Sequence, residues 1–317
     1  MRLAVVIVNW NVRDLLRRCL TSLQAAIETA GVETAVVVVD NGSTDGSVAL
    51  LRAEFPWVQV VASPTNVGFT RGNNLALRAL GFNDTPTSPL PSYVLLLNPD
   101  TEVPPTALTT LLAYMDAHPE LGLLGPRLRY ADGSLQSSRR RFPTLATGLL
   151  ESTVLQQWWP TAPALQRFYM NDQPEDRPQA VDWLVGACLL TRREALVQVG
   201  LLDEGYFMYS EEVDWARRFK ALGWQVVYLP TVEIMHYEGR STEQVVAQRH
   251  IYFQTSKARY FRKWHGPLVG EALRLFLLAT YVYQLVEEGA KWLLGHKRPL
   301  RAERVRAYWR VLRSGLR

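Results

Sequence analysis

Three carboxylic acids, Glu211, Glu212 and Asp214, lie within four residues of one another in the segment DEGYFMYSEEVDWARRF. Acids in the first turn of a helix gain from the helix dipole, and Ser210 before them is a residue type that caps helices, so a structural role is sufficient to explain them. Residues 206–209 are mostly aromatic and favour a second interpretation. An acid at the rim of an apolar pocket can have a raised pKa and act as a general base. Spacing alone does not choose between the two.

A fourth acid, Asp100, ends the apolar run SYVLLLNPDTEV, and His236 follows a second apolar run in IMHYEGRST. An ordinary turn is sufficient to explain Asn98-Pro99-Asp100. A single histidine after a strand is more often structural than catalytic. If the fold brings Asp100 and His236 together, they form a ligand pair for a divalent cation, completed by diphosphate oxygens and water. The sequence leaves both interpretations open.

Alternating elements are predicted to position these side chains. Residues 3–10 and 34–41 are continuous valine-rich runs, the pattern of strands buried on both faces, and residues 14–30 between them have apolar side chains at helical spacing. The alternation continues to the run YVLLL at 93–97. We therefore expect an α/β fold with an open, mostly parallel sheet flanked by helices.

Polar clusters follow three of the predicted strands. Ligands of such sheets bind at the carboxyl ends of the strands, so the clusters predict a binding site at one edge of the sheet. The first strand is not followed by GxGxxG, and the sequence has no Walker phosphate loop, so a bound nucleotide would be held in another way. The clusters are Asn9-Trp10-Asn11, Asp40-Asn41-Gly42-Ser43 and Asn98-Pro99-Asp100.

Composition is that of a globular protein, with 48% hydrophobic and 21% charged residues among 317. Only two cysteines are present, and both lie in apolar surroundings, which favours a reducing compartment and two core residues. The first residues resemble a buried strand rather than a signal peptide. No run approaches 18 uninterrupted apolar residues, so we predict no membrane-spanning helix.

Positive charge is concentrated at the end of the chain. Residues 245–317 hold 15 Lys and Arg against 4 acids, a net charge of +11, whereas the preceding residues carry a net charge of −6. A basic, amphipathic helical segment suits the surface of an anionic membrane. A helical cap on the catalytic domain or a homo-oligomer interface are the alternatives. Aromatic residues at 252–283 recur at helical spacing, which indicates a core, so nucleic acid is not expected as a partner.

The ordered motifs resemble those of family 2 glycosyltransferases, most closely the bacterial rhamnosyltransferase-type enzymes of cell-surface polysaccharide synthesis. The resemblance covers roughly residues 1–265 and is carried by VVIVNWN, VVVVDNGSTDGS, NVGFTRGNN, LLLNPDTEV, DWLVGACLLTRREALVQVGLLDEGYFMYSEEVDWARRFKALGWQVVYLP and HYEG. It implies a Rossmann-like GT-A fold with a catalytic domain at 1–240. A basic, amphipathic helical extension would follow at 241–317.

The resemblance also implies a reaction. It is the inverting transfer of a sugar from a nucleotide-diphospho-sugar to a hydroxyl of a saccharide or polyprenyl-lipid-linked acceptor, with Mg²⁺ or Mn²⁺. Rhamnose is the sugar suggested by overall similarity. A cytoplasmic protein, peripheral on the inner face of the cell membrane, would reach such an acceptor. The alternative is a non-catalytic nucleotide-sugar-binding protein, which loss of Asp100 or of all three acids at 211–214 would mark; neither is lost.

Roles carried over from the family fall into three groups. Those for the nucleotide are Asn9, Asp40, Asn66, Gly68, Asn73 and Asn98, with Asp40 at the base or ribose. Those for the metal are Asp100 and His236. Glu212 is the expected base, with Glu211 and Asp214 as alternatives. The chain departs from the family pattern at Asn98, where many relatives have aspartate, and at Glu212, which replaces an aspartate.

Overall fold

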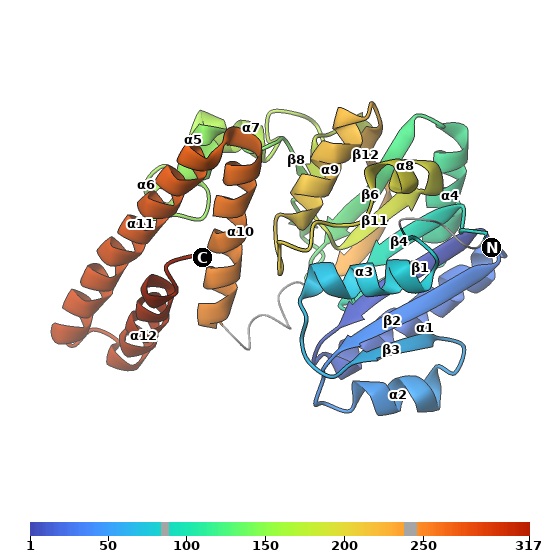
Figure 1. Cartoon of the computed structure of the whole chain (residues 1–317), viewed down its shortest axis with the longest axis horizontal. Helices are drawn as coiled ribbons and strands as arrows, with labels where there is room; N and C mark the ends of the chain where they lie inside the picture. The colour runs from blue at the N-terminus through green and yellow to red at the C-terminus, as the bar shows by residue number, and fades with distance from the viewer. Residues whose placement is uncertain (84–88, 238–245) are drawn as a thin grey trace. The chain divides into compact units, whose positions relative to one another are not determined.

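The computed structural model describes residues 1–83, 89–237 and 246–317 (Figure 1). The chain forms two compact units. Unit 1 comprises Met1–Phe142, Gln173–Phe207 and Glu211–Ser241. Unit 2 comprises Pro143–Asp172, Met208–Ser210 and Thr242–Arg317. Unit 2 therefore holds the C-terminal helices expected after residue 240, together with the segment Pro143–Asp172.

The first hundred residues of unit 1 alternate between strands and helices, as their apolar pattern predicts. All residues of the first and fourth strands are buried, because helices cover both faces of the sheet. The elements are β1 (Leu3–Asn9), α1 (Arg13–Ala30), β2 (Thr34–Asn41), α2 (Ser47–Glu54), β3 (Gln59–Ser63), α3 (Phe69–Ala79) and β4 (Tyr93–Leu97).

Each face of β1 packs on a different set of helices. Leu3, Val5 and Ile7 join the core that contains the buried side chains of α1 and of α4 (Ala107–Ala117). On the other face Gly72 of α3 lies so close to the sheet that a Cβ on it would be 2.7 Å from Cγ1 of Val8. This glycine therefore allows α3 to approach the sheet closely.

The main sheet is mixed, with the order β3-β2-β1-β4-β11-β6-β12-β5. Strands β1 to β4 run parallel, β11 is antiparallel to both of its neighbours, and β12 is parallel to β6. The remaining elements of unit 1 are β5 (Thr101–Glu102), β6 (Leu121–Arg129), β7 (Leu135–Gln136), β8 (Arg139–Arg140), β9 (Gln179–Ala180), β10 (Trp183–Leu184), β11 (Cys188–Arg192), α8 (Arg193–Val199), α9 (Glu211–Ala221) and β12 (Gln225–His236).

One continuous apolar run of the sequence is divided between two strands. The run WLVGACLLT forms β10, which pairs with β8 in a separate two-stranded sheet, and then β11 in the main sheet. A turn at residues 186–187 separates them. Glycine and alanine at this turn have little side chain to bury, which explains the break in an otherwise continuous apolar run.

Unit 2 is helical. Its members are α5 (Leu145–Leu150), α6 (Val154–Trp158), α7 (Pro163–Phe168), α10 (Val246–His265), α11 (Pro267–Leu293) and α12 (Arg298–Ser314), with α11 packed on both α10 and α12. Helix α5 lies against α10, where a Cβ on Gly148 would be 2.7 Å from Cζ of Phe261. The buried Lys257 also donates a hydrogen bond to the Glu151 carbonyl oxygen at 2.5 Å. These contacts explain why residues 143–172 belong to unit 2.

Helix α11 changes one expectation from the sequence. By length and composition it is apolar enough to cross a membrane, although no run of 18 uninterrupted apolar residues occurs in it. One third of its most apolar 18-residue window is buried within the protein. The core helix of a globular protein meets the same criterion, so composition alone does not assign a span.

Candidate active site

Asp100 and His236 lie side by side although 136 positions separate them in the sequence. The short strand β5 pairs with the end of β12, which places His236 opposite Thr101. The Tyr237 amide also donates a hydrogen bond to the Asp100 carbonyl oxygen at 2.8 Å. As a result Oδ1 of Asp100 is 3.3 Å from Nε2 of His236, and both side chains are less than 10% exposed.

The atoms around this pair fit a divalent cation. His236 Nδ1 lies 2.9 Å from the Gln136 amide oxygen, and Nε2 faces Asp100. An imidazole that donates from Nδ1 to Gln136 would bind a metal through Nε2. Within the described residues, the Asn98 side-chain oxygen is buried with no hydrogen-bond partner. Carboxylate oxygen, amide oxygen and imidazole nitrogen all ligate Mg²⁺ or Mn²⁺. Among the described residues, no three or more His, Cys, Asp or Glu side chains are placed so that they could hold a metal ion together. The remaining ligands of a cation would therefore come from outside the protein.

The strand end that carries Asp100 is fixed on both sides. The Asn98 backbone N–H donates to the Ala187 carbonyl oxygen at 2.9 Å, and the buried Thr101 hydroxyl donates to the Asn98 backbone carbonyl oxygen at 2.8 Å. Pro99 between them has a restricted φ. A carboxylate presented from such a rigid turn keeps its position, and misplacement of a reacting group by 1 Å can cost about 100-fold in rate.

A second polar cluster forms where β1 and β2 end. Their parallel register places Asn9 opposite Asp40, and the Asn9 amide donates to Asp40 Oδ1 at 3.0 Å. Ser43 accepts from the same amide at 3.1 Å and donates its backbone N–H to Asp40 Oδ2 at 3.0 Å. Each oxygen of the buried Asp40 carboxylate retains a lone pair for a further donor, such as a hydroxyl.

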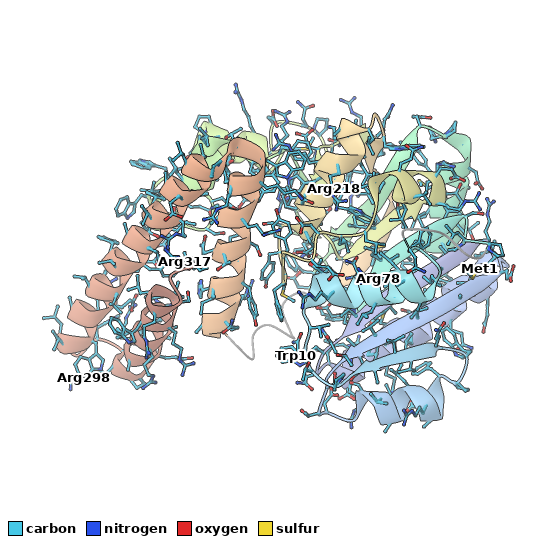
Figure 2. The ribbon with its side chains drawn as sticks, viewed as in Figure 1. Met1, Trp10, Arg78, Arg218, Arg298 and Arg317 are labelled. Atoms are coloured by element: carbon cyan, nitrogen blue, oxygen red, sulfur yellow. The ribbon has the colours of Figure 1, made fainter. Side chains whose placement is uncertain are left out.

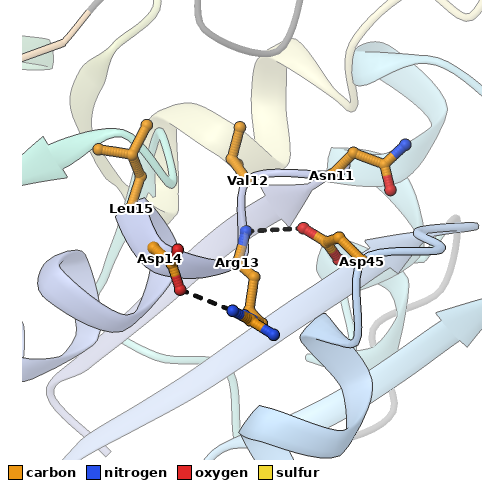
Figure 3. Close-up of a pocket in the computed structure, with 6 residues that line it drawn as sticks. All are labelled: Asn11, Val12, Arg13, Asp14, Leu15 and Asp45. Carbon is orange, nitrogen blue, oxygen red and sulfur yellow. Dashed lines mark hydrogen bonds and ion pairs between the residues drawn. The ribbon is translucent and has the colours of Figure 1, made fainter.

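A shallow pocket of roughly 300 Å³ opens beside this cluster, at the start of α1 (Figure 3). The Asp45 carboxylate accepts from the Arg13 backbone N–H at 2.8 Å and closes one wall. Asn11, in the left-handed region with φ 53°, donates its backbone N–H to the Ser43 hydroxyl at 3.0 Å. The pocket is lined by Asn11, Val12, Arg13, Asp14, Leu15 and Asp45.

The glycine-rich segment NVGFTRGNN forms a turn that Asn41 holds in place. The Asn41 amide donates to the Asn66 side-chain oxygen at 2.9 Å, and its own oxygen accepts from the Val67 N–H at 2.9 Å. Gly68 has φ 92°, and a Cβ on it would be 2.5 Å from the Phe207 carbonyl oxygen. The buried Asn73 donates to the carbonyl oxygen of Phe69, one turn earlier in α3.

The three clustered acids occupy three different environments. Asp214 is fully buried and pairs with Arg218, labelled in Figure 2, at 3.0 Å. Glu211 is also buried, and burial together with the adjacent Glu212 raises its pKa well above the ordinary range. Glu212 is half-buried. Ser210 has φ 62°, outside the extended region that N-cap residues usually adopt, so its backbone is not that of a typical cap.

Glu212 lies at the same end of unit 1 as the Asp100 turn. A Cβ on Gly186 would be 3.7 Å from Cβ of Glu212, an ordinary contact distance. The next residue, Ala187, accepts the hydrogen bond from Asn98. The turn at 186–187 therefore touches both Glu212 and the strand end that leads to Asp100.

Some residues that shape the site could be predicted and others could not. Asn41 and Ser43 belong to the polar cluster after the second predicted strand, and both contact other residues of the site. Gln136 lies in a two-residue strand with no periodicity, so nothing in the sequence pointed to it as the partner of His236. Gly186 lies inside an apolar run and has no side chain, so it gave no signal either.

Comparison with known proteins decides the family. A model of the family described as glycosyltransferase-like family 2 matches residues 1–250. The chain belongs to this family. An N-acetylglucosaminyl-diphospho-decaprenol L-rhamnosyltransferase of Mycobacterium tuberculosis is 36% identical over 243 residues, 76% of this chain and 77% of the relative. The rhamnosyltransferase WbbL of Escherichia coli K12 is 24% identical over 207 residues, 62% of this chain and 70% of the relative.

Solved structures of glycosyltransferases share the fold. A mannosyltransferase from Pyrobaculum calidifontis, in complex with GDP-Man and Mn²⁺, matches 99% of this chain and 84% of its own with a TM-score of 0.53 and 16% identity. GalNAc-T7 with UDP, GalNAc and Mn²⁺ matches 83% of this chain but only 48% of its own, with a TM-score of 0.55 and 14% identity. The predictions of a GT-A fold and of a rhamnosyltransferase-like family 2 glycosyltransferase are confirmed.

Proposed function

We propose that this glycosyltransferase moves a sugar, rhamnose by similarity to its relatives, from a nucleotide-diphospho-sugar to a hydroxyl of a saccharide or polyprenyl-lipid-linked acceptor. The transfer would invert the anomeric carbon and serve cell-surface polysaccharide synthesis. The observation that carries the proposal is the placement of Asp100 and His236 beside the Asn98 side chain, whose amide nitrogen is 3.3 Å from His236 Nε2, at the same end of unit 1 as Glu212. The names of the relatives support the sugar and the lipid-linked acceptor.

Glu212 is the proposed base. It is the one of the three acids that is partly exposed, and it would take the proton of the acceptor hydroxyl as the oxygen attacks the anomeric carbon. Glu211 is too deeply buried for that contact, and Asp214 is engaged with Arg218. These two acids would support the start of α9 rather than touch the substrate.

Asp100 and His236 are the residues that would hold a divalent cation, with the Asn98 oxygen as a weaker third ligand. A bound Mg²⁺ or Mn²⁺ would offset the negative charge that develops on the leaving nucleoside diphosphate. An amide at position 98 supplies one charge fewer than an aspartate, so we expect weaker metal binding than in relatives that have aspartate there.

The nucleotide would lie along the polar ends of β1 and β2. Asp40 retains lone pairs for ribose or base donors, and Asn9 holds its carboxylate in orientation. The turn with Asn66 and Gly68 would line the same pocket, with Asn73 behind it.

A cytoplasmic enzyme, peripheral on the inner face of the membrane, would reach a lipid-linked acceptor. The two free and buried thiols, Cys19 and Cys188, accord with a reducing compartment. The acceptor in the name of the mycobacterial relative, a diphospho-decaprenol, supports a membrane location.

Thermal-shift titration tests the proposal. UDP-, GDP- and dTDP-sugars would be titrated with and without Mn²⁺ or Mg²⁺, because a ligand that binds only the folded state raises the melting temperature. We expect a metal-dependent shift with one donor that Asp100→Ala abolishes. Glu212→Gln should keep that shift and lose transfer activity. No shift with any donor would refute the donor and metal assignment, and a shift without transfer by the wild type would favour the non-catalytic binding protein.

A further inference from the structure

Helix α11 carries an uninterrupted row of exposed apolar side chains along its solvent face. Successive members are three or four residues apart, which keeps them on one side of a helix. Over this span the row is about 38 Å long, at roughly 1.5 Å per residue. No charged residue interrupts the apolar row, which consists of Leu268, Ala272, Leu275, Ala279, Val282, Val286, Ala290 and Leu293.

The charged side chains of α11 all form ion pairs within unit 2. Glu288, for example, is buried and contacts Arg301 at 2.6 Å, and Lys291 pairs with Glu287 at 2.5 Å. This helix therefore combines a wholly apolar exposed face with charged residues that all form ion pairs. Such a face is typical of a contact surface rather than of ordinary solvent exposure. The charged residues are Glu271, Arg274, Glu287, Glu288 and Lys291.

Unit 2 also exposes tryptophans and arginines. Trp158 of α6 packs edge-on against Tyr283 of α11 at 5.7 Å, and Trp158 and Trp159 are each more than half exposed. At the other end of α11, Trp292 is 43% exposed. Helix α12 adds exposed Arg306, Arg310 and Arg313 at helical spacing, with exposed Trp309 next to Arg310. Tryptophan and arginine are the side chains that favour the interface between lipid and water.

We propose that this face docks on an anionic lipid bilayer, with α11 lying along the surface and the apolar row inserted at the boundary of the headgroups. The inference deepens the proposed function, because it supplies the surface through which a lipid-linked acceptor is reached. The net charge of +11 over residues 245–317 attracts anionic lipid and repels a second copy of the same face. A span across the bilayer would bury the ion pairs of Arg274 and Glu288 in hydrocarbon, which is costly.

Vesicle co-sedimentation with the full chain tests the docking face. We expect binding to vesicles that contain phosphatidylglycerol, weaker binding to pure phosphatidylcholine, and a decrease with added salt. The double variant Val282→Glu/Val286→Glu should lower the vesicle partition coefficient by about tenfold or more. The matched control Val197→Glu/Leu222→Glu changes two equally exposed residues of unit 1 and should leave it unchanged.

Three outcomes would overturn the proposal. The first is equal loss of vesicle binding in both double variants. The second is a wild-type dimer in light scattering that becomes a monomer in Val282→Glu/Val286→Glu, since the row would then face a second copy. The third is a protein that resists carbonate extraction from membranes, which indicates a span. Transfer to a water-soluble saccharide should survive in Val282→Glu/Val286→Glu, so failure of the docking face and failure of the proposed reaction give different results.

A second inference concerns the three residues that lead into α9. Tyr209 and Ser210 both adopt left-handed backbone angles, with φ 70° and 62°, which residues with side chains rarely do. The surrounding structure must enforce such a conformation, and strain of this kind often lies at functional sites. Within unit 2, α10 supplies the restraint. Ser256 donates its hydroxyl to the Met208 carbonyl oxygen at 2.7 Å, and Phe253 packs edge-on against Tyr209 at 5.6 Å.

The geometry points to Ser256 and Phe253 as positioning residues for the base. Ser210 is bonded directly to Glu211, so a change in the backbone of Met208–Ser210 passes directly to the first residue of α9. The inference rests on the proposed role of Glu212, which lies in that turn. Neither positioning residue is expected to touch the substrate; each would act through the backbone.

Steady-state kinetics on Ser256→Ala tests this role. We expect kcat to fall by about tenfold, an effect of a slightly misplaced base, while KM for the donor stays within twofold. Ser256→Thr retains the hydroxyl and should recover most of kcat. Ser314→Ala removes a comparable hydroxyl-to-carbonyl bond, from Ser314 to Val311 at 2.7 Å, and should leave kcat unchanged.

An unchanged kcat in Ser256→Ala would overturn the inference, as would an equal fall of kcat in Ser256→Ala and Ser314→Ala. Glu212→Gln in the same assay reports on the base itself. If Glu212→Gln stays active while Ser256→Ala does not, the base assignment fails separately from the positioning role.

Discussion

Replacement of Gly68 by alanine should destabilise unit 1 far more than the same replacement at Gly200. Both glycines adopt backbone angles that are almost exclusive to glycine, with φ 92° and ψ 167° at Gly68 and φ 77° and ψ −178° at Gly200. Their surroundings differ. A Cβ on Gly200 would meet no atom within 4 Å, whereas a Cβ on Gly68 would be 2.5 Å from the Phe207 carbonyl oxygen and 2.8 Å from its ring. The pair therefore separates backbone strain from close packing.

The magnitudes follow from these contacts. Backbone strain costs about 1–3 kcal/mol and applies to both variants. At Gly68 the Phe207 backbone must also move, which weakens the hydrogen bond from the Phe69 N–H to its carbonyl oxygen, now 2.8 Å, at a cost of about 1 kcal/mol. Crowding of a well-packed contact adds about 1–3 kcal/mol. Gly68→Ala should thus lose about 2–4 kcal/mol more than Gly200→Ala.

Urea unfolding followed by tryptophan fluorescence measures the difference, because the midpoint falls in proportion to the lost free energy when the slope is constant. We also expect KM for the nucleotide-sugar to rise in Gly68→Ala and not in Gly200→Ala, since only Gly68 lies in the proposed nucleotide pocket. Equal unfolding midpoints for the two variants would refute the argument that Phe207 fixes this turn.

Three further predictions concern buried groups. Burial raises the pKa of Glu211, so its ionised form destabilises the folded state above that pKa. Glu211→Gln should therefore raise the melting temperature near pH 8 and change it little below about pH 4, where the carboxyl is protonated in both the folded and the unfolded protein. An equal change in melting temperature at both pH values would contradict this. Arg218→Met removes the ion pair to the buried Asp214 and should lower the free energy of unfolding by about 3–5 kcal/mol in chemical denaturation. Adding Asp214→Asn to this variant should restore part of the loss, and no recovery would contradict the pairing. Burial raises the pKa of both thiols, that of Cys19 to about 12, so a disulfide reagent should modify neither Cys19 nor Cys188 in the folded protein and both in denaturant.

The parallel half of the sheet could be predicted because its evidence is local. A run such as residues 34–41 shows its burial on both faces in its own composition, and the helix before it shows its apolar stripe. The antiparallel half gave no such evidence. Strand β5 has two residues, too few for any periodicity, and its pairing with β12 joins segments more than 130 residues apart. The sequence could therefore propose that Asp100 meets His236, but only the structure brings them together.

The acids at 211–214 show the same limit within a single helical turn. The spacing of Asp214 and Arg218 is that of an ion pair on one helix face, so the structural role of Asp214 was open to prediction from the sequence. Glu211 and Glu212 are adjacent, and the choice of which one faces the interior depends on what α9 packs against. Burial separates them, since Glu211 lies in the core while Glu212 stays partly accessible next to Gly186. A base must reach its substrate as well as hold a proton, and this difference in burial is the reason why we propose Glu212 rather than Glu211.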